Sequence, residues 1–190
     1  MLARAATLFG RVLEVWLIVL MVALTVLVIA GVLFRKFGAS LSWYDEVASY
    51  MLIWVTYYGS ALAALRRKHI GFDGVLLSLP LKVRRVAFVV AEILVIGFFV
   101  LFTWGGWIVF QIVRGDGLVS LPWVSLQIPH SVIPAGGAVF IVAELLSVPE
   151  AWRAALAGVS LEHEEIEEEI REAQKEASKL AAHGRHGGSP

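Results

Sequence analysis

The sequence predicts an all-α membrane protein with four transmembrane helices. Hydrophobic residues make up 58% of the 190 residues and charged residues 17%, whereas soluble domains average about 45–50% and about 25%. The apolar residues gather in four continuous stretches, at residues 12–34, 47–65, 86–113 and 128–148. About 20 apolar residues in a helix cross a hydrocarbon core of about 30 Å. Continuous runs favour helices over barrel strands, in which apolar and polar positions alternate.

The first stretch, residues 12–34, predicts an uncleaved helix and not a secretory signal. Its 23 residues contain one charged side chain, Glu14, and a signal peptide has an apolar region of only about 7–15 residues. Arg35 and Lys36 follow without a clear small-residue cleavage site. We therefore expect this helix to remain in the protein.

The second stretch, residues 47–65, follows a segment rich in polar and aromatic side chains. Ser42 is in position to cap its first turn, and Asp45 and Glu46 suit the positive end of the helix dipole. Aromatic residues recur along the same helix after Glu46, and two small residues four positions apart, Gly59 and Ala63, allow another helix to approach closely. This face predicts packing within the bundle or against another protein. The residues assigned to partner contact or helix capping are Trp43, Asp45, Glu46, Tyr50, Trp54, Gly59 and Ala63.

The loop at residues 66–85 predicts a short amphipathic helix in the inner membrane interface. Its apolar residues Phe72, Val75, Leu76 and Leu79 have the spacing of one helical face, and cations flank them. A plain loop is the alternative. The residues assigned to interfacial anchoring are Arg66, Arg67, Lys68, His69, Arg84 and Arg85.

The third and fourth stretches each contain one carboxylate, Glu92 and Glu144. Together with Glu14 they lie toward the cytoplasmic ends of their helices, where nearby arginines are available for ion pairing. A proton-coupling or cation-coupling site is the alternative. Pro129 and Pro134 predict an irregular start of the fourth helix, because proline lacks a backbone donor.

The distribution of basic residues predicts that both termini are cytoplasmic. One side of the membrane would hold nine lysines and arginines, namely Arg4, Arg11, Arg66, Arg67, Lys68, Lys82, Arg84, Arg85 and Arg153. The other side would hold three, namely Arg35, Lys36 and Arg114.

The composition changes after Pro149. Residues 1–149 carry eleven basic and seven acidic residues, and residues 150–190 carry five and nine. Opposite charges three or four residues apart, such as Glu167 and Arg171, support a solvated helix. We expect a four-helix transmembrane domain over residues 1–149 and a charged cytoplasmic tail over residues 150–190. A thin apolar stripe in the tail leaves docking on a partner open.

Several functional classes lack the residues that they require. The chain has no cysteine, so thiol redox chemistry is excluded. It contains no phosphate-binding loop, serine-hydrolase elbow or zinc-protease motif. Its histidines are not placed to face each other across a haem, and a net charge of zero gives no attraction for nucleic acid. We expect no catalytic residue, cofactor or metal site.

One series of residues runs from the start of the second stretch into the loop that follows it, and a second group lies at the start of the fourth stretch. They are Trp43, Asp45, Glu46, Trp54, Gly59, Ala61, Ala63, Arg66, Arg67, Lys68, His69, Ile70 and Asp73, and then Pro129, Ile133, Pro134 and Gly136. This pattern resembles the small membrane subunit (DctQ type) of tripartite ATP-independent periplasmic (TRAP) transporters. The resemblance covers residues 8–148 and leaves out the acidic tail. It departs from the family at Ser49, where an arginine is common, so an ion pair made by that arginine would be missing or remade elsewhere.

The resemblance implies a bacterial inner-membrane complex with two partners. A large multi-span subunit (M type) would carry the substrate and sodium sites, and a periplasmic binding protein (P type) would deliver organic acids. The small subunit would brace the large one, contact membrane lipid and help to dock the binding protein. The alternative is a self-sufficient four-helix transporter or channel that acts as a homo-oligomer, which Glu14 in the first helix suggests.

Overall fold

The computed structural model describes residues 2–39, 41–67, 78–157, 170–171 and 173–175. Within these ranges the chain forms helices joined by short loops, with one isolated bridge between Gly117 and Ser125. The principal helices are α1 (Leu2–Lys36), α2 (Tyr44–Leu65), α4 (Leu81–Ile112), α5 (Gln127–His130) and α6 (Val132–Ala157).

Among the residues that the structure describes, four helical segments are long and apolar enough to cross a membrane. They are Arg4–Lys36, Tyr44–Leu65, Leu81–Ile112 and Gln127–Ala157. The predicted all-α membrane fold is confirmed. The centre of the predicted interfacial helix and most of the predicted tail helix lie outside the described residues.

The helices are longer than the apolar stretches that predicted them. α1 has 35 residues and α4 has 32, and at 1.5 Å per residue both exceed a hydrocarbon core of about 30 Å. α6 also continues past the expected end, through Pro149 to Ala157, although a proline inside a helix removes one backbone hydrogen bond. The transmembrane helices therefore extend beyond their most apolar segments.

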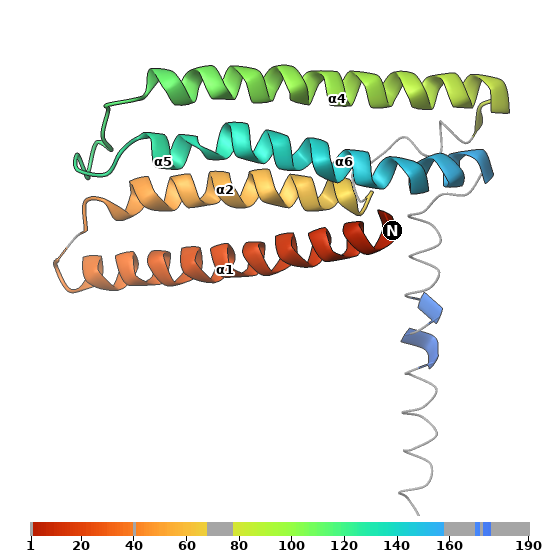
Figure 1. Ribbon diagram of the computed structural model, residues 1–190. Helices are drawn as coiled ribbons and strands as arrows, with labels where there is room; N and C mark the ends of the chain where they lie inside the picture. The colour runs from red at the N-terminus through yellow and green to blue at the C-terminus, as the bar shows by residue number, and fades with distance from the viewer. Residues whose placement is uncertain (1, 40, 68–77, 158–169, 172, 176–190) are drawn as a thin grey trace, which may run out of the picture. The chain divides into compact units, whose positions relative to one another are not determined.

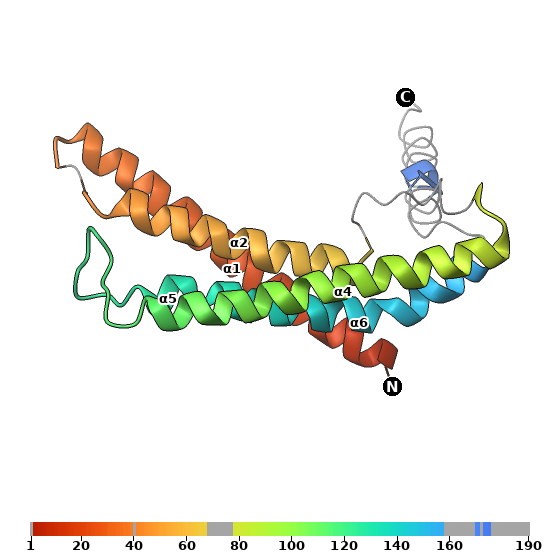
Figure 2. The ribbon, with the colours of Figure 1, turned by 90° about the horizontal axis from the view of Figure 1, so that it is seen from above.

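The chain divides into two compact units. The first comprises Met1–His69 and Val89–Pro149, and the second comprises Ile70–Phe88 and Glu150–Pro190. In the first unit α5 and α6 lie between α2 and α4, and α1 lies on the other side of α2 (Figure 1). Seen from above, the α1–α2 pair runs obliquely across the α4–α6 pair (Figure 2).

Small residues set the packing of the first unit. Its buried cluster consists of Leu13, Ala61, Ala64, Phe140 and Ala143. Lipid tails are as apolar as the side chains, so burying an apolar side chain between membrane helices gives little hydrophobic free energy. Small residues stabilise helix pairs instead by allowing the backbones to approach closely. The rings of Phe99 in α4 and Phe140 in α6 stack with centroids 3.6 Å apart.

The irregular start of the fourth span is confirmed. A short helix, α5, ends at His130, and α6 begins at Val132. Pro129 lies buried in α5. At the junction the N–H of Ser131 donates to the carbonyls of Gln127 and Ile128, whereas Pro134 has no N–H to donate to the carbonyl of His130.

In the second unit, Arg84 joins the start of α4 to the end of α6. Its Nη1 donates to the carbonyl of Ala155 at 3.2 Å, and its Nη2 donates to the carbonyl of Leu79 at 3.2 Å. A cation at the carbonyl end of a helix is favourable. The rings of Phe88 and Trp152 pack edge to face beside this contact, with centroids 5.4 Å apart.

Candidate functional site

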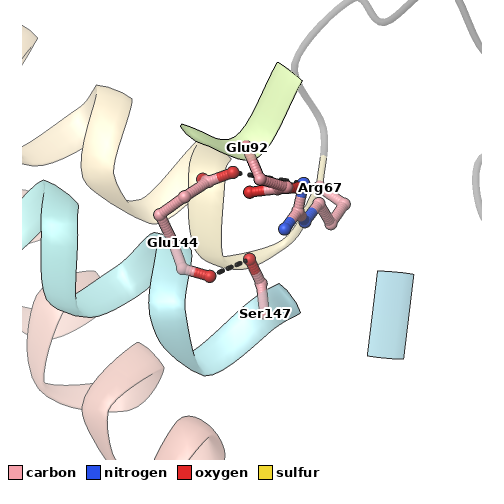
Figure 3. A network of polar contacts seen from close by, with 4 residues as sticks. All are labelled: Arg67, Glu92, Glu144 and Ser147. Carbon is pink, nitrogen blue, oxygen red and sulfur yellow. Dashed lines mark hydrogen bonds and ion pairs between the residues drawn. The ribbon is translucent and has the colours of Figure 1, made fainter. Parts of the chain in front are cut away.

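One arginine connects three helices at the end of the bundle where α2 ends (Figure 3). The Nη1 atom of Arg67 lies 2.7 Å from Oε1 of Glu92 in α4 and 3.1 Å from Oε1 of Glu144 in α6. The three side chains are largely buried, with exposed fractions of 22%, 12% and 7%. We call these three residues the Arg67 cluster.

The backbone of Arg67 explains how its side chain reaches the other helices. Arg67 has a φ of 51°, in the left-handed region where a helix commonly ends. Its N–H donates to the carbonyl of Ala64 at 3.1 Å, and the N–H of Arg66 donates to that of Leu62 at 3.0 Å. A residue other than glycine pays roughly 1–2 kcal/mol for this conformation, so the cluster contacts must outweigh that cost.

A second ion pair lies on the α1 side of the same helix end. Nη2 of Arg66 is 2.9 Å from Oε1 of Glu14, and both side chains are more than two-fifths exposed. The structure thus brings each predicted intramembrane glutamate together with an arginine that the sequence assigned to interfacial anchoring. Lys68 and His69, assigned to the same role, lie outside the described residues.

At the opposite end of the bundle, Glu46 holds the loop between α4 and α5. Its Oε1 accepts a 3.0 Å hydrogen bond from the N–H of Val119, and its Oε2 accepts a 2.7 Å bond from the N–H of Ser120. The loop is also closed on itself, because the N–H of Leu118 donates to the carbonyl of Val124 at 3.0 Å. Carboxylate bonds to backbone N–H groups are among the stronger hydrogen bonds in proteins.

Two aromatic residues of α2 contact α5. The indole Nε1 of Trp54 donates to the carbonyl of Pro129 at 3.1 Å, at the junction between α5 and α6. The ring centroids of Tyr50 and His130 are 5.9 Å apart. Both residues had been assigned to a packing face, and both make contacts within the chain.

The predicted cap of α2 by Ser42 is wrong. The N-cap residue is Trp43, and no side chain forms a cap hydrogen bond there. Asp45 is exposed, and Ser49, at the position where the family commonly has arginine, donates from its hydroxyl to the carbonyl of Asp45 at 2.8 Å. In this chain the first turn of α2 is anchored through Glu46 instead.

Helices approach closely at several glycines. A Cβ added at Gly136, which the resemblance included, would lie 2.9 Å from the Cβ of Tyr57, and one added at Gly137 would clash with the hydroxyl of Thr103. A Cβ added at Gly31 or Gly106 would clash with Tyr44 or Ile133, respectively. At Gly59, which had been selected, the nearest atom would be 4.0 Å away, on Leu17. In the sequence, the two adjacent glycines at positions 136 and 137 are the feature that indicates this close helix packing.

Much of the bundle surface is apolar. On α1 one exposed stripe consists of Leu8, Val12, Val15, Val19, Val22, Val26 and Ile29. Exposed aromatic side chains of α4 include Phe98, Trp104 and Trp107. Trp104 and Trp107 also line an apolar groove of about 600 Å³, whose other wall includes Pro134 and Ile141.

In the part of the chain that the structure describes, no three histidine or acidic residues are grouped to hold a metal ion. The Arg67 cluster and the Glu46 contact are polar connections between helices and loops. Neither contains a nucleophile paired with a general base.

A family profile described as the DctQ component of tripartite ATP-independent periplasmic transporters matches residues 24–154. The matched region includes Glu46 and the whole Arg67 cluster, and it leaves out Glu14. No curated protein matches the chain.

Proposed function

This chain belongs to the DctQ component family of tripartite ATP-independent periplasmic transporters and is a small membrane subunit of that transporter type; we propose that it braces the large membrane subunit and helps to dock the periplasmic binding protein. The family is a transport family and not an enzyme family. The proposal places the chain in a bacterial inner membrane with both termini in the cytoplasm, as the nine-to-three distribution of basic residues suggests.

The scaffold role is supported by the ion pairs that the three intramembrane glutamates form with arginines. Glu92 and Glu144 contact Arg67, and Glu14 contacts Arg66. A coupling ion would have to displace these contacts, which connect α1, α2, α4 and α6. An arrangement that uses its charges to fix helices suits a rigid support for a moving subunit.

The side of α4 offers a surface for the large subunit. A Cβ added at Gly97 or Gly105 would meet no atom within 4 Å, so these glycines are not required by packing inside the chain. Glycines on a membrane helix are typical of places where a second helix approaches closely. The groove beside Trp104 and Trp107 adds a concave apolar surface on α4, whereas the α1 stripe consists of aliphatic side chains suited to lipid.

The loop between α4 and α5 offers a surface for the binding protein. Val119 is 90% exposed and Trp123 is 80% exposed, while Glu46 fixes the backbone at Val119 and Ser120. A loop that presents large apolar side chains on a fixed backbone loses little entropy when it binds. In the proposed topology this loop faces the periplasm.

Transport in proteoliposomes tests the proposal. A panel of organic acids is first screened for thermal stabilisation of the binding protein, and the acid found is used as the radiolabelled solute. Liposomes contain the large subunit with or without this chain, and the binding protein is added outside under an inward sodium gradient. Uptake is expected only when all three proteins and the sodium gradient are present. Uptake that is equally fast without this chain, or under a potassium gradient alone, would contradict the proposal.

The alternative, a self-sufficient homo-oligomeric transporter, gains no support from the contacts of Glu14. That residue suggested the alternative, and it forms an ion pair with Arg66. Liposomes containing this chain alone serve as the direct control, and we expect no solute flux from them.

A further inference from the structure

The Arg67 cluster contains more negative than positive groups. One guanidinium faces two carboxyl groups, and the Oε1 atoms of both contact the same nitrogen, Nη1. If both carboxyl groups were ionised, the cluster would carry a net charge of minus one. Burying an uncompensated charge is costly in a protein interior and more so at membrane depth.

The other ion pair at this helix end has no such excess. Arg66 and Glu14 form a one-to-one pair, which is formally neutral and supplies no spare cation. From α6, the hydroxyl of Ser147 donates to the backbone carbonyl of Glu144 at 2.9 Å and not to its carboxyl group. Among the described residues, the ion pairs of Glu92 and Glu144 are both made with Arg67. On α4, Arg84 donates to the carbonyls of Ala155 and Leu79. Lys68 and His69 follow Arg67 in sequence and lie outside the described residues.

The two carboxyl groups are neighbours. Their Oε1 atoms lie 2.7 and 3.1 Å from the same nitrogen of Arg67. When two carboxyl groups share a site in this way, the charge on one disfavours ionisation of the other. The Oε2 atom of Glu92 is buried without a hydrogen-bond partner, and burial without a donor disfavours the ionised form.

We propose that the Arg67 cluster binds one proton at neutral pH, held between the carboxyl groups of Glu92 and Glu144. The proton comes from water as the bundle assembles, and no bond other than the O–H bond is formed. With one proton bound, a cation, an anion and a neutral acid connect the end of α2 to α4 and α6. The cluster is then neutral overall, and Arg67 keeps both contacts. This inference does not depend on the transporter assignment.

Infrared spectroscopy of the full-length chain detects this proton through the carbonyl stretch of a carboxylic acid. Dodecyl maltoside is the detergent because it has no ester carbonyl that would overlap. At about pH 7.5 carboxyl groups with ordinary pKa values near 4 are ionised and do not contribute. The wild-type chain is expected to show one carboxylic-acid band.

Three variants locate the proton. Glu92→Gln and Glu144→Gln each leave a single carboxylate opposite Arg67, so each is expected to abolish the band completely. Glu14→Gln removes a carboxylate from the one-to-one pair with Arg66 and is expected to leave the band unchanged. Absence of the band in the wild-type chain overturns the proposal without reference to any variant, and so does a band that survives in either Glu92→Gln or Glu144→Gln.

Discussion

The carboxylate of Glu46 in the first turn of α2 accepts a 2.7 Å hydrogen bond from the backbone N–H of Ser120, which lies 74 residues later in the chain. The second carboxylate oxygen accepts from the neighbouring N–H of Val119. One side chain therefore fixes the position of the loop that follows α4 relative to the start of α2.

Removing one acceptor oxygen at Glu46 tests this connection. Glu46→Gln keeps the length of the side chain, but its amide NH₂ cannot accept, so one loop N–H loses its partner. We expect a lower unfolding temperature and faster proteolytic cleavage within residues 117–126, measured by thermal unfolding and limited proteolysis in mild detergent. Asp45→Asn, at the exposed neighbouring position, is the control for the loss of one charge near the positive end of the helix dipole and should leave the cleavage within residues 117–126 unchanged. Equal behaviour of the two variants would contradict the role of Glu46.

The two arginines after α2 should differ in their contribution to stability. Arg67→Gln leaves two buried carboxyl groups without their cation, and breaking a buried ion pair in this way costs about 3–5 kcal/mol. Arg66→Gln removes a pair whose side chains are more than two-fifths exposed, so its cost should be about 0–1 kcal/mol. Thermal unfolding of both variants in the same detergent gives the comparison, and the reverse order would show that the cluster is not a structural centre.

The indole of Trp54 should stabilise the fold through the hydrogen bond of its N–H as well as through the packing of its ring. Trp54→Phe keeps an aromatic side chain and removes the donor to the Pro129 carbonyl, with an expected cost of about 0.5–1.5 kcal/mol. Trp104→Phe, on the exposed side of α4, is the matched control. Hydrogen exchange at the α5–α6 junction should increase in the first variant alone.

Two glycines should respond in opposite ways to the same change. Gly136→Leu places a side chain against Tyr57, where even a Cβ would lie 2.9 Å away. Overpacking of this kind costs about 1–3 kcal/mol or more. Gly97→Leu meets open space and should leave the unfolding temperature of the isolated chain unchanged or slightly raised, because leucine favours a helix more than glycine does. Similar losses in both variants would contradict the described packing of α4.

The number of membrane helices, the helical fold and the break near Pro129 follow from the sequence because they depend on local properties. Apolar length predicts a spanning helix, and proline predicts the irregular start of the fourth span. The helix ends were underestimated, since α1 and α4 continue into segments that contain arginines and lysines.

The contacts of the candidate site depend on residues that are distant in sequence. Glu46 was correctly selected as important but was assigned to capping or partner contact, because nothing local indicates that residues 119 and 120 fold back onto it. Arg67 was assigned to interfacial anchoring. Its left-handed backbone conformation turns the side chain toward α4 and α6, and the sequence does not indicate this conformation because the residue is not a glycine. Pairing of the glutamates with arginines was expected in general terms, whereas the two-to-one ratio at Arg67 required the structure.

Co-purification tests the central claim most directly. The chain is tagged, co-expressed with the large membrane subunit of its transporter and isolated in mild detergent as wild type, as Gly97→Leu and as Ala23→Leu, which changes an exposed small residue of α1. The account predicts that wild type and Ala23→Leu retain the large subunit and that Gly97→Leu loses most of it while remaining folded. Recovery of the wild-type chain without the large subunit would contradict its role as a subunit of this transporter.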